Sequence, residues 1–460
     1  MLTSSQIKHL IHCTALVVFS IWLISSLLPV ADAESEKLDP WATYGYLNTL
    51  ILYILRILVL LALPQVLLNA LGLLCYNAFP EAVVLKGSPI LTPLICFRIV
   101  TRGDFPQLVK ENVTKNLSNC SEAGIENFII EVVSDRALHL VQRSRIREVI
   151  VPTSYRPRSG AMYKARALQY CLESDVNILS DDDYVVHLDE ETIMTSESIR
   201  GILNFVLEKK YDFGQGMITY ANGQVINWFT TLADSIRVAD DMGKLRAQFY
   251  IFHKPLFSWK GSFIVSRVGA ERDVSYDHGI KGSIAEDCYF AMHAFMKGYT
   301  FDFVDGEMYE KSPFSSWDFI QQRKRWVQGI SMAVRASEIP WKYKALLACS
   351  LCAWITMPLS LTNIVTGFIY PLPVPNWLNI LALIVSAVNV YMYFFGVIKS
   401  LSVYRLGLLK YGLCLISLIF VILMSAILES VAIIMALFGD KKKFYVVKKD
   451  WINDEGLQSV

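Results

Sequence analysis

The chain has 460 residues, of which 53% are hydrophobic, and its formal net charge is +1. Its mean hydropathy of +0.38 is too high for an ordinary soluble protein, and the apolar excess lies in long runs at both ends of the chain. We therefore expect a membrane protein with one sizeable soluble domain. The near-zero charge argues against a nucleic-acid-binding protein, which would show a surplus of basic residues.

The N-terminal 80 residues contain two long apolar runs. The first covers residues 7–30, and its apolar core is too long for a signal peptide. The second covers residues 47–76, which is more than the roughly 20 residues that a membrane span needs, and Pro64 is expected to kink it. Because an acidic linker separates the two runs, we predict that residues 1–80 form two transmembrane helices with a short external loop.

The middle of the chain, residues 81–343, alternates strand patterns with helical patterns, which is typical of a mostly parallel sheet with helices on both faces. Nine cysteines without a repeating spacing indicate reduced or buried thiols, as in a cytosolic domain. Asn112, Asn116 and Asn119 each match the short N-glycan acceptor pattern, which would be irrelevant on the cytosolic side. The predicted strands cover residues 95–100, 128–133, 148–151, 184–191 and 214–220, and the predicted helices cover residues 161–172, 196–208, 288–296 and 315–334.

Three more apolar runs follow at residues 345–370, 377–398 and 411–438, within a predicted C-terminal transmembrane part at 344–438. The Lys and Arg residues next to the spans place the soluble domain and the loop at 399–410 in the cytosol. A single fifth span would place the basic tail, residues 439–460, outside. Either the last span is re-entrant or split, or the tail is an exception to the rule that basic residues next to spans lie in the cytosol. We expect a cytosolic tail.

The strand at residues 184–191 ends in a cluster of acidic side chains. Asp189 and Glu191 lie two residues apart and are expected to converge just beyond the strand, where open α/β sheets bind their ligands. Hard oxygen donors at that place suit Mg²⁺ or Mn²⁺ carrying a diphosphate. The alternative is a solvated acidic loop.

Two further features are predicted to contact the donor. Asp135 follows the second strand, where a carboxylate can accept hydrogen bonds from a nucleotide base, although a single Asp is as often a helix or turn cap. Gly160 opens the predicted helix that contains Lys164, and a helix N-terminus with basic residues forms an anion site. Without the carboxylates, this stretch would be interpreted as a solvated basic helix start.

Two motifs near the end of the soluble domain carry the remaining candidates. Glu286 and Asp287 begin an apolar helix, where the helix dipole favours anions. Because activation of a sugar hydroxyl requires a carboxylate within hydrogen-bonding reach, we assign the role of general base to Asp287. Farther along, Gln322, Arg325 and Trp326 share one helix face, which offers a cation to a leaving diphosphate and a flat wall to a sugar. The alternative is an interfacial basic helix with an aromatic anchor.

In this order, a strand-end Asp, a DxD-like pair, an acidic dipeptide and QxxRW resemble the membrane-embedded family 2 glycosyltransferases, which include cellulose, chitin and hyaluronan synthases. The resemblance implies a GT-A catalytic domain, a nucleotide-sugar donor, a divalent metal and inversion at the anomeric carbon. It implies that Asp135 contacts the base, that Asp189 and Glu191 serve the diphosphate and the metal, and that Asp287 is the catalytic base. One departure is Glu191, where the pattern has Asp. The remaining candidates are Lys164 and Arg325 for the donor, and Glu286, Gln322 and Trp326 for the acceptor and diphosphate site.

More narrowly, the sequence resembles the Egghead-type β-1,4-mannosyltransferases over nearly the entire chain. The match rests on the N-terminal pair of spans and on residues 187–192, 284–287, 312–315, 322–329 and 444–447. It implies transfer of mannose from GDP-mannose to glucosylceramide in an ER or Golgi membrane, by a domain that faces the cytosol. Residues 444–449 also partly match the FxVTxK gating loop of processive relatives, and Trp259 is a candidate for shaping the lipid entry.

Four alternatives stay open. A processive polysaccharide synthase needs more spans for a polymer channel than about five apolar runs provide, and a dolichyl-phosphate mannose synthase would not be expected to carry QxxRW. From a different class, intact Asp189, Asp287 and Arg325 argue against a non-catalytic membrane scaffold with a degenerate transferase fold. Arg56 and Glu429 are too few intramembrane charges to indicate the ion path of a transporter.

Overall fold

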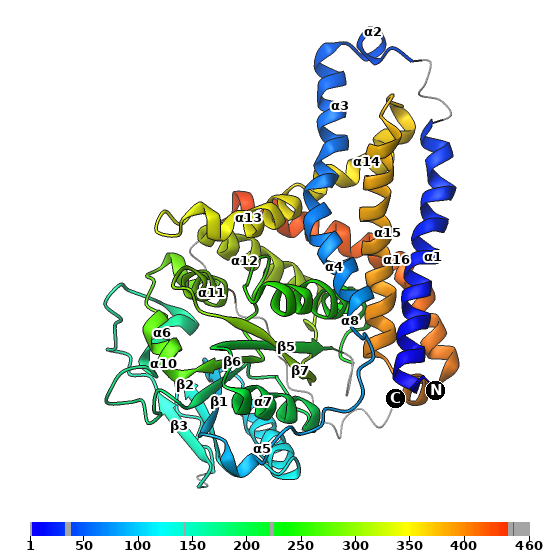
Figure 1. Ribbon diagram of the computed structural model, residues 1–460. Coiled ribbons are helices and arrows are strands. Elements are labelled where there is room, and N and C mark those ends of the chain that lie inside the picture. The colour runs from blue at the N-terminus through cyan, green and yellow to red at the C-terminus, as the bar shows by residue number, and fades with distance from the viewer. Residues whose placement is uncertain (1, 33–37, 142–143, 221–224, 440–444, 446–460) are drawn as a thin grey trace. The chain divides into compact units, whose positions relative to one another are not determined.

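The computed structural model (Figure 1) describes residues 2–32, 38–141, 144–220, 225–439 and Tyr445. The chain divides into two compact units. The helical unit consists of Met1–Glu81, Leu232–Gln248 and Ala345–Phe438, and the sheet unit consists of Ala82–Thr231, Phe249–Lys344 and Gly439–Val460. Residues 232–248 thus lie in the helical unit, although the sequence analysis placed them inside the soluble domain.

The sheet unit is built on a seven-stranded sheet with the strand order β3-β2-β1-β4-β6-β5-β7. β6 runs antiparallel to β4 and β5, and the other strand pairs of this described sheet are parallel, which confirms the predicted mostly parallel sheet. Strands β4 and β5 are buried at every residue, as expected for strands covered on both faces. The strands are β1 (Ile95–Thr101), β2 (Phe128–Ser134), β3 (Ile146–Ile150), β4 (Tyr184–Leu188), β5 (Phe213–Thr219), β6 (Ile264–Arg267) and β7 (Phe301–Tyr309).

Helices cover both faces of this sheet (Figure 1). Neighbouring residues of β5 demonstrate it, because side chains alternate between the two faces of a strand. Phe213 packs edge-on against Phe290 of α11 at 5.4 Å between ring centroids, whereas a Cβ at Gly214 would meet Phe205 of α7 at 2.8 Å. The helices of the sheet unit include η2 (Pro89–Leu91), α5 (Pro106–Glu122), α6 (Tyr163–Tyr170), α7 (Ser196–Glu208), α10 (Val268–Val274), η5 (Lys281–Ser283), α11 (Glu286–Met296) and α12 (Ser316–Arg335).

The helical unit holds the apolar runs. Four of its described helical stretches are long and apolar enough to cross a membrane, or five if the pair α13 and α14, bent by 54°, is one span. A 3₁₀ turn ends directly before the helix that contains Pro64, and the kink expected at this proline stays a prediction. The helices are α1 (Ser4–Asp32), α2 (Pro40–Tyr44), α3 (Tyr46–Leu58), η1 (Val59–Ala62), α4 (Leu63–Cys75), α13 (Trp341–Ile355), α14 (Met357–Ile369), α15 (Asn376–Ser400) and α16 (Val403–Phe438).

The inserted segment 232–248 packs tightly against α4 of the same unit. A Cβ at Gly72 would lie 2.1 Å from the carbonyl oxygen of Gly243, so glycine is what permits this approach. Arg246 donates hydrogen bonds to the carbonyls of Tyr76 and Asn77, at 3.0 and 2.8 Å, and so satisfies backbone groups at the C-terminal end of α4. The segment contains α9 (Ser235–Asp240) and η3 (Asp241–Leu245), and α8 (Trp228–Ala233) and η4 (Gln248–Phe252) border it.

Candidate active site

The candidate donor-binding carboxylates lie at the same edge of the sheet. Because β2 and β4 both pair in parallel with β1, Asp135 and Asp189 follow strand ends on the carboxyl side. Two basic side chains of α6 reach these two carboxylates: Nη1 of Arg166 lies 2.9 Å from Asp135, and Nζ of Lys164 lies 2.6 Å from Asp189. One short helix therefore ties both predicted donor contacts together.

Lys164 is the centre of the site. Besides Asp189, its ammonium donates to the carbonyl oxygen of Gly261 at 3.0 Å and lies 3.8 Å from Glu286. Burial by itself lowers the pKa of Lys164, but the carboxylates of Asp189 and Glu286 outweigh it and hold that pKa above its usual value. A Cβ at Gly261 would lie 3.0 Å from Oδ2 of Asp287, so a glycine here leaves room for the charged groups.

The acidic pair at the start of α11 lies beside this ammonium. Glu286 is buried, and burial followed by the charge of Asp287 raises the pKa of Glu286 to about 7. Burial also raises the pKa of Asp287, against the opposing effects of its hydrogen bond from the Cys288 N–H and of the charges of Lys164 and Arg325. A carboxyl group whose pKa lies near neutral pH can exchange a proton with a substrate hydroxyl.

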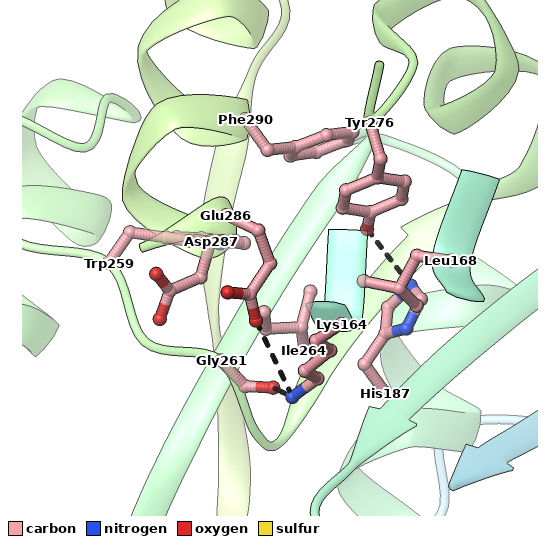
Figure 2. A pocket seen from close by; sticks show the side chains of 10 residues that line it. All are labelled: Lys164, Leu168, His187, Trp259, Gly261, Ile264, Tyr276, Glu286, Asp287 and Phe290. Carbon is pink, nitrogen blue, oxygen red and sulfur yellow. Dashed lines mark hydrogen bonds and ion pairs between the residues drawn. The ribbon is translucent and has the colours of Figure 1, made fainter. Parts of the chain in front are cut away.

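A small cavity adjoins the acidic pair (Figure 2). It has room for about one water molecule. At its far end, Nε2 of His187 lies 2.7 Å from Glu271 and 3.3 Å from the hydroxyl of Tyr276, whose ring stacks on Phe290 one turn after Glu286. The cavity is lined by Lys164, Leu168, His187, Trp259, Gly261, Ile264, Tyr276, Glu286, Asp287 and Phe290. The contacts of His187 and Tyr276 were not predicted from the sequence, because they join segments far apart in the chain.

The predicted opening of the basic helix at Gly160 is wrong. The helix begins at Tyr163 and not at Gly160. The backbone N–H groups of Ser159 and Ala161 donate to Asp277, at 2.6 and 3.2 Å, and are therefore already used. Of this stretch, the side chain of Lys164 is what reaches the site.

The helix α12 carries the QxxRW motif, and Ser315 caps its N-terminus by accepting a hydrogen bond from the Asp318 N–H at 3.1 Å. Arg323 is 2% exposed and lies over the ring of Trp326, with 4.5 Å from its Cζ to the ring centroid. It also donates to Gln322 at 2.5 Å. Arg323, which the sequence analysis did not single out, therefore positions two of the predicted acceptor-site residues, and Arg325 acts on the acidic pair through its charge.

Gly329 lets α12 approach the start of α11. A Cβ at this position would lie 2.5 Å from Cβ of Ala285, the residue before Glu286. We expect Gly329→Ala to push the acidic pair out of place, which would lower kcat roughly tenfold and destabilise the fold by about 1–3 kcal/mol. Steady-state kinetics and thermal unfolding measure the two effects. Gly412→Ala, at a helical glycine with open space around it, is the matched control and should change neither.

The three acidic residues after β4 have different roles. Glu190 is buried and accepts a hydrogen bond from Thr101 of β1, so it serves the fold. Asp189 contacts Lys164, and Glu191 is half-buried in the turn that follows. Among the residues that the structure describes, no group of three or more His, Cys, Asp or Glu side chains is placed to hold a metal ion. One or two carboxylates still fit a Mg²⁺ whose other ligands are phosphate oxygens and water.

The predicted gating segment 444–449 lies outside the described residues except for Tyr445. The hydroxyl of Tyr445 donates to Asp318 of α12 at 2.8 Å. The roles predicted for the site residues stay predictions. These residues are Asp135, Lys164, Asp189, Glu191, Glu286, Asp287, Gln322, Arg325 and Trp326. What the structure adds is the proximity of Asp189, Lys164 and Glu286.

Comparison with known proteins assigns the chain. The model of the glycosyl transferase family group 2 matches residues 184–439. The chain is 57% identical over 449 residues to the beta-1,4-mannosyltransferase egh of Drosophila melanogaster, and 53% identical over 453 residues to the beta-1,4-mannosyltransferase bre-3 of Caenorhabditis elegans. Each alignment covers 97% of this chain and 98% of the relative. The S. aureus TarS 1–349 structure is 14% identical, with a TM-score of 0.34 over 75% of this chain and 92% of that one, which is too distant to carry an argument.

These matches define the class of the protein as a glycosyltransferase with a GT-A sheet domain and apolar helices long enough to cross a membrane. The chain belongs to glycosyltransferase family 2, in the Egghead-type group that contains egh and bre-3.

Proposed function

We propose that this enzyme transfers mannose from GDP-mannose to the 4-hydroxyl of the glucose of glucosylceramide, with inversion, on the cytosolic side of an ER or Golgi membrane. The observation that best supports a glycosyl-transfer reaction is the position of the Lys164 ammonium. It forms an ion pair with Asp189 and lies 3.8 Å from Glu286. Asp189, the proposed donor contact, and Glu286, the neighbour of the proposed base Asp287, thus share one ammonium. The sugar and the linkage are supported by the beta-1,4-mannosyltransferase relatives.

In the proposed reaction, the acceptor oxygen forms a bond to C1 of mannose as the bond from C1 to the phosphate oxygen breaks. Asp287 takes the proton of the acceptor hydroxyl, and GDP leaves with the electron pair of the broken bond. Lys164 and Arg325 offset the charge that grows on the departing diphosphate, which is an electrostatic stabilisation of the transition state. A single displacement converts an α-linked donor into a β-linked product without an enzyme nucleophile.

A divalent cation, Mg²⁺ or Mn²⁺, fits the donor set as a further part of this proposal. Asp189 and Glu191 would hold it, and when bound it would neutralise phosphate charge. Lys164 would then exchange its contact with Asp189 for one with the diphosphate. The apolar helices account for the lipid acceptor, because the ceramide can stay in the bilayer while its sugar enters the site.

The test uses the full-length protein in detergent with glucosylceramide and Mg²⁺ or Mn²⁺. GDP-mannose is offered beside UDP-glucose and UDP-N-acetylglucosamine, and the lipid products are resolved by mass. Addition of one hexose from GDP-mannose alone is the expected result. A ladder of sugars from a UDP donor would instead identify a processive polysaccharide synthase and overturn the proposal.

The acidic pair predicts how activity depends on pH. A raised pKa leaves a carboxyl group protonated at higher pH than usual, and a protonated base cannot accept the acceptor's proton. We therefore expect kcat at saturating substrates to fall as the pH drops toward the raised pKa of Asp287. A profile that stays flat down to roughly pH 5 would contradict a role for the pair. Burial also raises the pKa of Asp302 on β7, to about 6, so Asp302→Asn is a control that should leave the profile unchanged.

A further inference from the structure

Three asparagines of α5 form a row on one side of this helix. Asn112, Asn116 and Asn119 follow each other at spacings of four and three residues, which places them on one face. Asn112 and Asn116 are buried, and Asn119 is half-buried. In the sequence they stood out only as N-glycan acceptor patterns.

The row binds the backbone that follows β4. The three side-chain amides donate, in order, to the carbonyl oxygens of Glu190 at 2.8 Å, Thr192 at 3.0 Å and Met194 at 2.6 Å. Asn116 also accepts a hydrogen bond from the Met194 N–H at 2.9 Å. The bonded carbonyls belong to every second residue, as along one edge of a β-strand. The asparagine side chains therefore satisfy the backbone of the turn after β4 and of the residues that follow it.

The other edge of this segment is paired as well. Ile193 exchanges two backbone hydrogen bonds with Tyr309 at the end of β7, at 2.8 and 2.9 Å. Within the segment, the hydroxyl of Thr192 lies 2.8 Å from that of Ser262, which accepts a hydrogen bond from the Asp189 N–H at 3.2 Å. The position of Asp189 is thereby coupled to the backbone that the asparagines hold.

We propose that the asparagine row is a positioning device for the donor site. By fixing residues 190–194, it sets where Asp189 and Glu191 present their carboxylates to the diphosphate and its cation. The inference rests on the proposed donor-binding role of these two residues. The same hydrogen bonds close Asn112 and Asn116 to glycan attachment in the folded protein, because an acceptor amide must be accessible.

Asn116→Asp tests the device in the full-length protein, because it keeps the shape of the side chain and removes the N–H donor to Thr192. Binding of GDP in the presence of Mn²⁺ is measured by calorimetry, together with the melting temperature. A small displacement of binding groups can cost up to about 10²-fold, so we expect GDP affinity to fall roughly 10- to 100-fold. The control is Asn127→Asp, at an exposed asparagine that donates to the Thr92 carbonyl at 3.1 Å at the opposite end of β2. Loss of this hydrogen bond should leave GDP affinity unchanged.

Hydrogen exchange at residues 190–194 gives a readout that needs no ligand. Faster exchange there in Asn116→Asp, with weaker GDP binding, supports the inference. Unchanged affinity in that variant, or an equal loss in Asn127→Asp, overturns it. Should Asn116→Asp fail to fold, the half-buried Asn119→Asp takes its place. Wild-type protein that binds no GDP would overturn the proposed function, whereas unchanged exchange in the variant would overturn the role of the row itself.

Discussion

Asp287→Asn is expected to lower kcat about 10³-fold while GDP affinity changes less than about twofold. An asparagine has the shape of aspartate but cannot take the proton of the acceptor hydroxyl. Asp287 is the second residue of α11 and lies against Gly261, beside the ammonium of Lys164. Single-turnover transfer at saturating donor and acceptor measures the loss.

Glu286→Gln is the matched variant for this prediction, because Glu286 precedes Asp287 directly and its pKa is also raised. Because glutamine does not ionise, any part of the acidic limb of kcat that Glu286 contributes near its pKa of about 7 should disappear, with a smaller loss of rate than in Asp287→Asn. If Glu286→Gln abolishes transfer and Asp287→Asn does not, the base is Glu286. That result would reverse the assignment made from the sequence.

Lys164→Met is expected to lower kcat/KM roughly 10²- to 10³-fold, because the variant loses a cation for the diphosphate. It also leaves the carboxylates of Asp189, Glu286 and Asp287 without their shared counter-charge. Since the charge of Lys164 lowers the pKa of Glu286 and of Asp287, its removal should raise both. The acidic limb of kcat should therefore move to higher pH, which a pH profile of the variant measures.

Lys164→Arg separates charge from geometry. The guanidinium keeps the positive charge, so the acidic limb should stay near that of the wild type. Its planar fork does not reproduce the contacts of an ammonium with Asp189 and the Gly261 carbonyl, so kcat/KM should recover only in part. An acidic limb that does not move in Lys164→Met would show that Lys164 exerts no control over the acidic pair.

Much of the local structure follows from the sequence. The predicted strands at 95–100 and 128–133 each differ by one residue from β1 and β2, and the predicted helix at 196–208 coincides with α7. Strand β6 and strand β7 were not predicted. β6 has only four residues, and β7 carries charged residues and a glycine that interrupt the apolar pattern.

The tertiary structure decided which members of a motif take part in the site. Glu190 and Asp189 are neighbours in one acidic run, yet Glu190 is buried against Thr101 while Asp189 contacts Lys164. The predicted helix start at Gly160 failed because Asp277, more than a hundred residues away, accepts from the N–H groups of this stretch. A local sequence pattern does not indicate a hydrogen-bond partner that belongs to a distant segment of the chain.

By itself, the sequence determined the apolar runs, the alternation of strands and helices, and the family, because each of these is recorded in residue order and spacing. The tertiary structure alone decided that residues 232–248 join the helical unit, that Lys164 bridges Asp189 and Glu286, and that Asn116 holds the turn after β4. The physical reason is that periodicity reports which side of an element is buried. It does not report which distant side chain or carbonyl completes the buried contact.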